Sequence, residues 1–202
     1  MPDREQTVFV VDDDADVLHA ISVLLSTAGL TTRTFQSASA FLDAYDPEQK
    51  GCLILDIRMP DMDGLQLQSL LKKRDETLPI IFITGHGTVP TAVQAIKDGA
   101  LEFLQKPFRD SELLDSIYRA MAVNRERRRA AILRQDVDRR LGSLTKRESQ
   151  VMELMVAGDT NKVIARKLNI SPRTVEIHRT RVMEKMCCET LAQLVHVTLK
   201  RD

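Results

Sequence analysis

The sequence predicts an α/β domain followed by an all-α domain, and three observations support this division. Residues 1–121 alternate short apolar runs with amphipathic stretches, a pattern typical of strands and helices in turn. Residues 143–202 contain only short helical patterns. Residues 1–121 also hold 11 basic and 19 acidic residues, a net charge of −8, whereas the remaining residues hold 18 and 10, a net charge of +8. We therefore expect two domains with different partners.

Five short segments are predicted to form strands, over residues 8–11, 31–35, 52–55, 80–83 and 101–104. Continuous apolar strands that alternate with helices indicate a parallel sheet covered on both faces. Among the intervening helices, the pattern over 17–28 ends at Gly29 and that over 92–97 is followed by Gly99, the residue type that favours a helix end. The first domain is therefore predicted to be a doubly wound (βα)5 fold with five parallel strands.

A further helical pattern begins at Asp110 and meets no Pro or Gly before Gly142. Its first part completes the α/β domain, and the charged remainder is predicted to be a helical linker. Four short helices follow, over residues 145–157, 160–168, 172–186 and 190–199. The predicted division is an α/β domain over 1–121, a linker over 122–142 and a four-helix domain over 143–202.

Polar residues follow four of the predicted strands: Asp12 and Asp13, then Asp56, Thr84 and Lys106. The carboxyl ends of parallel strands meet at one edge of a sheet, where ligands bind in such folds. Close carboxylates repel each other unless a cation lies among them, and Mg²⁺ prefers oxygen ligands of this kind. Each residue alone also fits a structural role, but their convergence favours a functional site.

The first domain resembles the receiver domain of bacterial response regulators. The resemblance lies in residues 11–14 (VDDD), 55–64 (LDIRMPDMDG), 83–87 (ITGHG), 99–100 (GA) and 106–108 (KPF). It implies that Asp56 is the nucleophile that accepts a phosphoryl group from a sensor histidine kinase. It also implies that Mg²⁺ or Mn²⁺ is bound by Asp12, Asp13, Asp56 and the backbone carbonyl of Arg58. The metal ion and Lys106 would offset the charge of the transferring phosphoryl group.

The same resemblance assigns a switch to Thr84 and Phe103. The Thr84 hydroxyl would move to bond the new phosphate, and Phe103, three residues before Lys106, would change rotamer in response. From the residues alone, a static core side chain is an equally good interpretation of Phe103.

The basic domain contains a helix-turn-helix pattern. Thr145 and Glu148 fit a capping box, and Ser171 followed by Pro172 fits an N-cap and the first position of a helix. Two helices joined by a tight turn, the second rich in basic and polar residues, indicate DNA binding. A helical bundle with a solvated basic face is the structural alternative.

The helix over 172–186 is predicted to contact DNA with one face. Its core side is predicted from residues at helical spacing: Val175, Val182 and Met186. From the opposite side we assign three residues to base edges: Glu176, Ile177 and Thr180. Four further residues are assigned to phosphates: Arg173, His178, Arg179 and Lys185.

This half resembles the LuxR-type helix-turn-helix, through residues 144–148 (LTKRE), 161–165 (NKVIA) and 170–178 (ISPRTVEIH). Together, the two halves look like a FixJ-like member of the NarL/FixJ response regulators. The resemblance implies a homodimer on double-stranded promoter DNA and activation of transcription with RNA polymerase. Phosphorylation would promote dimerisation through the fourth helix and fifth strand, or release the DNA-binding domain. Cys187 and Cys188 depart from the family pattern, which makes redox sensitivity an alternative to inert thiols.

Two other function classes fit parts of the chain. A Mg²⁺-dependent hydrolase would use similar aspartates, but no second substrate-binding domain is visible, so no enzyme is expected. A basic half that binds RNA or protein instead of DNA is the other alternative, and an aromatic content of 4% argues against base stacking on single strands. No apolar run is long enough to cross a bilayer, and residues 1–6 show no basic region leading into an apolar stretch, so a cytoplasmic protein without membrane contact is expected.

Overall fold

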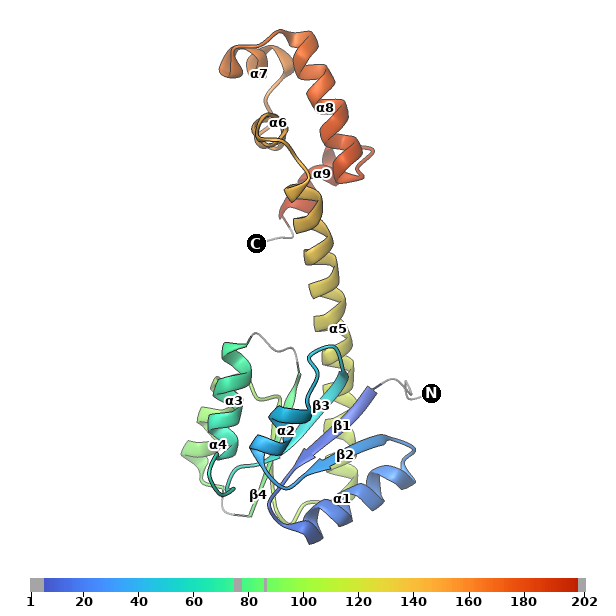
Figure 1. Ribbon diagram of the computed structural model, residues 1–202, viewed down its shortest axis with the longest axis vertical. Helices are drawn as coiled ribbons and strands as arrows, with labels where there is room; N and C mark the ends of the chain where they lie inside the picture. The colour runs from blue at the N-terminus through green and yellow to red at the C-terminus, as the bar shows by residue number, and fades with distance from the viewer. Residues whose placement is uncertain (1–5, 75–77, 86, 200–202) are drawn as a thin grey trace. The chain divides into compact units, whose positions relative to one another are not determined.

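The structure is a computed structural model that describes residues 6–74, 78–85 and 87–199. The short apolar runs of the first half form five parallel strands in the order β2-β1-β3-β4-β5 (Figure 1). Their bounds are β1 (Gln6–Val11), β2 (Thr31–Phe35), β3 (Lys50–Asp56), β4 (Ile80–Thr84) and β5 (Glu102–Gln105). The prediction of a doubly wound, five-stranded parallel sheet is confirmed.

Helices cover both faces of this sheet because alternate residues of each strand point to opposite sides. Val8 and Val10 of β1 belong to one buried cluster, with α1 (Ala15–Thr27) and the first turns of α5 (Asp110–Gly142). Phe9 and Val11 belong to the other, with α2 (Ala38–Ala44), α3 (Gly64–Lys73) and α4 (Val89–Lys97). All four strand side chains are completely buried. Two covered faces therefore explain why β1, β3 and β4 each contain an unbroken apolar run.

Local sequence explains where several helices begin and end. The Asp14 side chain accepts the backbone N–H groups of Asp16 and Val17, so it caps the first turn of α1. Gly29 follows that helix with φ +71°, and Gly99 follows α4 with φ +105°. These are left-handed conformations that glycine adopts without a steric penalty. The predicted ends at both glycines are confirmed.

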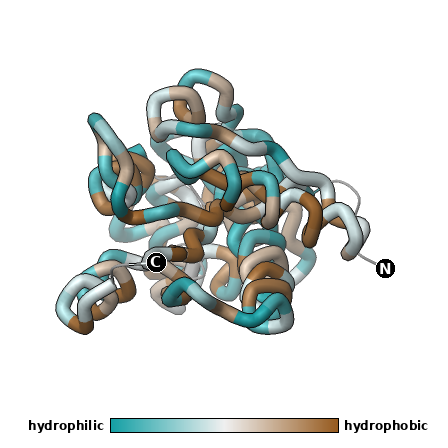
Figure 2. Tube along the Cα trace, turned by 90° about the horizontal axis from the view of Figure 1, so that it is seen from below, coloured by the Kyte–Doolittle hydropathy of each residue, from teal (hydrophilic) through white to brown (hydrophobic). Residues whose placement is uncertain are grey.

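The chain divides into two compact units, residues 1–128 and 129–202. In the second unit, four short helices surround their own core: α6 (Lys146–Val156), α7 (Asn161–Leu168), α8 (Pro172–Met186) and α9 (Leu191–Leu199). The core side of α8 is formed as predicted, since Val175, Val182 and Met186 are fully buried. Along the helices, the trace changes repeatedly between hydrophobic and hydrophilic residues, which reflects their one-sided burial (Figure 2).

Helix α5 is a single helix that contributes residues to both units. The sequence-based division ended the first domain at residue 121, whereas the first unit extends to Arg128. Among the described residues, no helix combines the length and the apolar character needed to span a membrane.

Candidate functional site

Two acidic residues lie at the carboxyl edge of the sheet on neighbouring strands. Asp12 directly follows β1, and Asp56 is the last residue of β3. The register pairs Val11 with Leu55, so the next residues along both strands are these two aspartates. Asp12 is 1% exposed and Asp56 is 5% exposed. Nearly buried carboxylates need a positive partner, because burying an unpaired charge is costly.

That partner is the ammonium group of Lys106. Its Nζ donates to Oδ2 of Asp12 at 2.6 Å and to Oδ1 of Asp56 at 3.0 Å. The other two carboxylate oxygens accept backbone N–H groups. Asp56 Oδ2 accepts from Arg58 at 2.6 Å, and Asp12 Oδ1 accepts from Asp14 at 3.0 Å. One cation therefore holds two predicted site carboxylates together, and the local backbone fixes their orientation.

The environment changes the acidity of both charged partners. Burial raises the pKa of the Asp56 carboxyl, and the opposing effect of Lys106 leaves a net increase. Burial by itself would lower the pKa of Lys106, but the hydrogen bonds to Asp12 and Asp56 outweigh it, so this pKa is raised. Lys106 therefore remains a positive charge throughout the neutral range.

The oxygen donors at this edge suit Mg²⁺ or Mn²⁺. The structure brings Asp12 and Asp56 together, while the Asp13 side chain is exposed beside them. Arg58 follows in the loop after β3 and contributes its N–H to Asp56. Within the described part of the chain, no three acidic, His or Cys side chains are grouped tightly enough to hold a metal ion. The donor chemistry fits a hard divalent cation, and the predicted set is assembled in part.

Thr84 is the last residue of β4, Phe103 lies on the neighbouring strand β5, and the side chains of both lie near Gly87. Thr84 is 1% exposed, and the half-buried Phe103 ring lies 6.4 Å from the Phe82 ring, centroid to centroid. A Cβ atom on Gly87 would stand 2.7 Å from the Phe103 ring and 2.9 Å from Cγ2 of Thr84. Gly87 thus leaves the space that both side chains use. Sequence reasoning missed this role, for which the only signal is the glycine itself.

The exposed side of α8 carries most of the residues predicted to contact DNA. Ser171 caps the helix by accepting the N–H of Thr174 at 3.0 Å, and Pro172 occupies the first position, as predicted. Ile177 is 47% exposed, which is high for an isoleucine in a folded unit. The outward-facing set consists of Arg173, Glu176, Ile177, Thr180 and Arg181, with Arg179 half-buried.

Lys185 lies apart from this outward-facing set. Its Nζ donates to Oε2 of Glu148 at 2.7 Å and to the carbonyl oxygen of Ser143 at 2.9 Å. Glu148 is itself 3% exposed and belongs to the capping box of α6 with Thr145, as the sequence predicted. These contacts give Lys185 a structural role in joining α6 to α8, which differs from the phosphate contact expected from its position in the sequence.

His178 lies at the border between the buried and exposed sides of α8. Its Nδ1 is buried and has no hydrogen-bond partner among the described residues. A buried N–H without an acceptor is costly, so the ring proton is better placed on Nε2. In that tautomer, the N–H donor of the half-buried His178 ring is Nε2.

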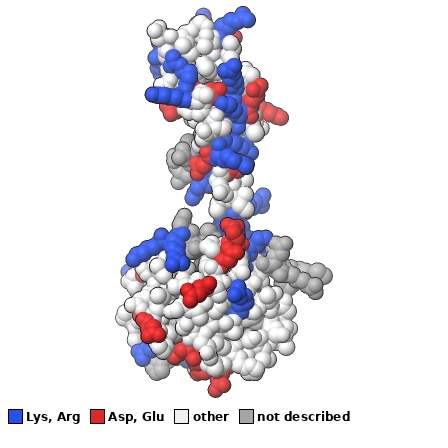
Figure 3. Space-filling model, viewed as in Figure 1, with Lys and Arg blue, Asp and Glu red and all other residues white. Residues whose placement is uncertain are grey.

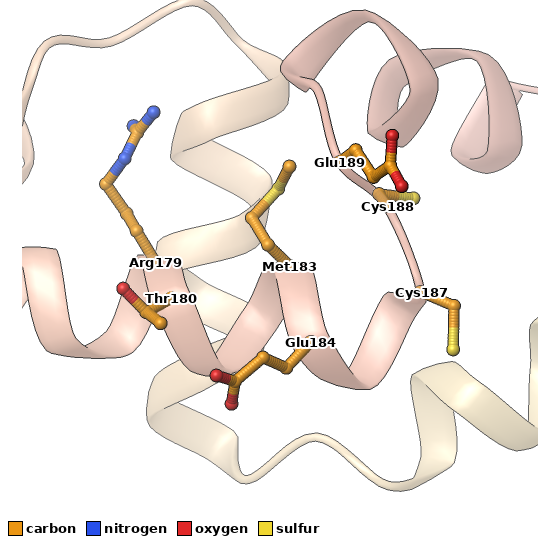
Figure 4. A pocket seen from close by; sticks show the side chains of 7 residues that line it. All are labelled: Arg179, Thr180, Met183, Glu184, Cys187, Cys188 and Glu189. Carbon is orange, nitrogen blue, oxygen red and sulfur yellow. The ribbon is translucent and has the colours of Figure 1, made fainter.

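A shallow hollow of about 600 Å³ adjoins the same helix (Figure 4). It is lined by Arg179, Thr180, Met183, Glu184, Cys187, Cys188 and Glu189. Both cysteines are free, and their sulfur atoms point apart in Figure 4. Burial also raises the pKa of the Cys188 thiol, which disfavours its reactive thiolate form. These features favour an inert thiol at Cys188.

Basic side chains gather over the second unit on the face that Figure 3 shows. This surface agrees with the composition of residues 129–202, which hold 15 basic and 9 acidic residues, a net charge of +6. A surface of this sign favours polyanions such as nucleic acids.

Comparisons with known proteins match both units. Residues 8–118 match the response regulator receiver domain, and residues 142–198 match the bacterial regulatory proteins of the luxR family. The response regulator protein TodT of Pseudomonas putida is 44% identical over 198 residues, which cover 98% of this chain and 87% of TodT. The transcriptional regulatory protein FixJ of Bradyrhizobium diazoefficiens is 42% identical over 193 residues, 96% of this chain and 94% of FixJ.

Solved structures give the same result. The low-resolution structure of the response regulator StyR matches with a TM-score of 0.86 at 46% identity, covering 97% of this chain and 99% of that chain. Full-length FixJ from B. japonicum matches with a TM-score of 0.61 at 41% identity, covering 98% of each chain.

Proposed function

This chain belongs to the NarL/FixJ-like response regulators of two-component systems, which join a receiver domain to a LuxR-type DNA-binding domain, and we propose that phosphorylation of Asp56 controls its binding to promoter DNA. Its relatives are regulators of transcription and not enzymes. The two domains imply a histidine kinase and DNA as partners. Receiver domains generally bind Mg²⁺ at the phosphorylation site.

The proposal for Asp56 is supported above all by the position of Lys106 between two carboxylates. In phosphoryl transfer, an Asp56 oxygen would form a bond to phosphorus, and the bond from phosphorus to the donor's histidine nitrogen would break. The phosphoryl group brings negative charge to a site that already holds Asp12. The Lys106 ammonium, 3.0 Å from Asp56, is placed to offset that charge.

We assign the metal ligands to Asp12, Asp13, Asp56 and the carbonyl of Arg58. When bound, Mg²⁺ or Mn²⁺ would supply positive charge that stabilises the transferring phosphoryl oxygens. Asp12 and Asp56 would hold it with hard carboxylate oxygens, and the exposed Asp13 lies at the rim. Lys106 contacts both of these carboxylates.

We propose that Thr84 and Phe103 report the phosphorylated state. Thr84 would turn its hydroxyl to the phosphate, and Phe103 would follow into the space that its movement leaves. This order is supported by their shared contact region at Gly87 and by the half-burial of the Phe103 ring. Because the Phe103 ring is only half-buried, few neighbouring side chains need to repack when it changes rotamer.

The output is proposed to be a homodimer formed through α4 and β5 of the receiver. Val89, Val93 and Ile96 are 78%, 46% and 45% exposed and lie on one side of α4 at helical spacing. An exposed apolar stripe of this kind favours contact with a second copy. Two copies would bring two α8 helices to paired half-sites on duplex DNA and would activate transcription with RNA polymerase.

Within each α8 helix, we assign base contacts to Glu176, Ile177 and Thr180, and phosphate contacts to Arg173, His178 and Arg179. The exposed N-terminal half of the helix supports the base contacts, because this part of a recognition helix reaches base edges. The position of the half-buried His178 on the same helix supports a phosphate contact. DNA as the partner also supports a cytoplasmic location.

The proposal is tested by incubating the protein with acetyl phosphate and Mg²⁺ and following its mass and oligomeric state, with Asp56→Asn alongside. We expect one phosphate on the parent only, and a shift of the parent towards a dimer. Phosphate on Asp56→Asn would move the acceptor to another residue, and a phosphorylated parent that stays monomeric would contradict the dimer. Competition between duplex and single-stranded DNA at fixed salt tests the nucleic-acid partner, because phosphate contacts alone bind both.

A further inference from the structure

Helix α5 makes polar contacts with the receiver unit beyond Met121, its last buried apolar residue. Asn124 is 1% exposed, and its Oδ1 accepts the backbone N–H of Gly51 at 3.1 Å. Gly51 lies at the start of β3, where a Cβ atom would stand 1.7 Å from the carbonyl oxygen of Thr7. Glycine at this position therefore lets β1 and β3 run close together beneath the helix.

The neighbouring turn of α5 is attached to the start of β1. Gln6, the first residue of β1, is 2% exposed and donates from Nε2 to the carbonyl oxygen of Met121 at 3.1 Å. Its Oε1 accepts from Nη1 of Arg125 at 3.3 Å. One turn further, Arg128 donates to the carbonyl oxygens of Pro47 and Glu48, both at 2.9 Å. We refer to Asn124, Gln6 and Arg128 as the polar clamp.

The clamp holds the same two strands that carry the phosphoacceptor site. β1 begins at Gln6 and is followed by Asp12, and β3 runs from the Gly51 contact to Asp56. From Gly51 to Asp56, every residue of β3 is buried. A buried, paired strand is a stiff element that transmits displacement instead of absorbing it. The carboxylates of Asp12 and Asp56 therefore lie at one end of β1 and β3, and the contacts with α5 lie at the other end of the same two strands.

We propose that the polar clamp couples the phosphorylation site to the linker. This coupling rests on the proposed function, because it requires that Asp56 accepts phosphate. The clamp residues are positioning residues, because their side chains bind backbone groups of the receiver unit. When phosphate changes the charge between Asp12 and Asp56, the relative setting of β1 and β3 changes, and the clamp passes this change to α5 before it enters the second unit. Without the clamp, residues 122–128 keep no buried apolar face, and such a helix segment is marginal by itself.

The test uses the full chain treated with acetyl phosphate and Mg²⁺. Intact mass measures phosphate uptake, and hydrogen exchange of peptides covering residues 129–142 measures the response of the linker in the same samples. We expect phosphate uptake by the parent to change the hydrogen-exchange rate of this segment by about fivefold. One ordinary hydrogen bond changes an equilibrium constant by about this factor. We expect Asn124→Ala and Arg128→Ala to take up phosphate at the parental rate but to lose most of that change.

Arg127→Ala is the matched control, because Arg127 is an exposed arginine on the same helix and the substitution removes the same charge as Arg128→Ala. It should respond like the parent. Arg128→Ala removes a peripheral contact, so it keeps the test valid if Asn124→Ala fails to fold. A full linker response in Arg128→Ala, or no response in a phosphorylated parent, overturns the coupling. A parent that takes up no phosphate overturns the proposed function instead, and the coupling with it.

Discussion

Glu148 of α6 and Lys185 of α8 form an ion pair, with 2.7 Å between Oε2 and Nζ, although 36 residues separate them in the chain. The Glu148 carboxylate also accepts the backbone N–H of Thr145 at 2.8 Å. One buried carboxylate therefore completes the first turn of α6 and anchors the last turn of α8. Lys185 therefore holds α8 at a set position on its domain.

This pair predicts how the stability of the second unit depends on pH. The hydrogen bond from Lys185 helps to lower the pKa of Glu148 from 4.5 to about 2. Because the folded pKa lies below the unfolded one, the stabilisation is fully present above about pH 4.5 and is lost as the pH falls to about 2. We expect Lys185→Met to lower the free energy of unfolding at neutral pH. Between about pH 4.5 and about pH 2, the free energy of unfolding of this variant should depend less on pH than that of the parent.

Urea titrations followed by far-ultraviolet circular dichroism measure the effect. Tyrosine fluorescence follows the first unit separately, since Tyr45 and Tyr118, the only tyrosines, both lie there. Arg181→Met, an exposed substitution on the same helix, is the control and should leave the curve unchanged. An unaltered pH dependence in Lys185→Met would show that the ion pair contributes nothing measurable.

Removal of the Lys106 charge should slow phosphoryl uptake. In Lys106→Met, Asp12 and Asp56 lose their shared cation, and the pKa of Asp56 should rise further because Lys106 now opposes that increase. We expect uptake from acetyl phosphate to fall by about 100-fold, the usual effect of removing one preorganised charge partner. The acid limb of the rate profile should also move to higher pH. Mass spectrometry over time measures both, and a parental rate would exclude Lys106 from the chemistry.

The two classes of α8 contact should respond differently to substitution. Glu176→Ala and Thr180→Ala should change base preference at one position, at a cost of about 1–3 kcal/mol for the preferred base. Arg179→Ala should weaken all duplexes by a similar factor and reduce the salt dependence of binding. Selection from a random duplex library, followed by titrations at two salt concentrations, separates the classes. A uniform loss in Glu176→Ala would mean that this residue does not face the bases.

Gly51→Ala should destabilise the receiver unit strongly. The new Cβ would stand 1.7 Å from the backbone oxygen of Thr7, and the φ of +149° is one that alanine rarely adopts. We expect a loss of about 3 kcal/mol or more in the free energy of unfolding, measured by urea titration with tyrosine fluorescence. Gly85→Ala is the control, because its Cβ would meet no atom within 4 Å. Equal stability of the two variants would contradict the close approach of β1 and β3.

A charge on α4 should separate dimerisation from phosphorylation. In Val93→Asp, the exposed apolar stripe is interrupted while the acceptor site is untouched, so uptake of phosphate should remain parental. Dimerisation of the phosphorylated protein should weaken by about tenfold or more, the effect of about 1.4 kcal/mol at an interface. Analytical ultracentrifugation measures it. Val23→Asp, on the equally exposed face of α1, should dimerise normally; weakened dimerisation in that variant would point to a different interface.

Local pattern was sufficient to predict most of the fold. Strands buried on both faces leave an unbroken apolar run, as in β3, and helix ends carry chemical signals such as Gly29, Thr145 and Ser171. The converging polar residues were also predictable, because the carboxyl ends of parallel strands meet at one edge. The short helix α2 carries only seven residues, and no periodic pattern was recognised there.

Long-range polar contacts were beyond such reasoning. Lys185 looks like a surface cation in the sequence, because nothing near it reveals that Glu148 is its partner. Asn124 looks like part of a polar linker, although it is buried against Gly51, 73 residues away. A local pattern reports which residues are apolar and at what spacing, but a polar side chain is placed by a partner that only the folded chain supplies.

The polar clamp also determines where this protein can be cut and rejoined. A chimera that exchanges the output domain after residue 121 would separate Asn124 and Arg128 from Gly51 and Glu48, and would leave a buried N–H without its acceptor. A junction placed after Arg128 would keep both partners of every clamp contact in the receiver half of the chimera. The end of an exchangeable receiver half is therefore set by long-range polar contacts, and it lies seven residues after the end of the apolar pattern.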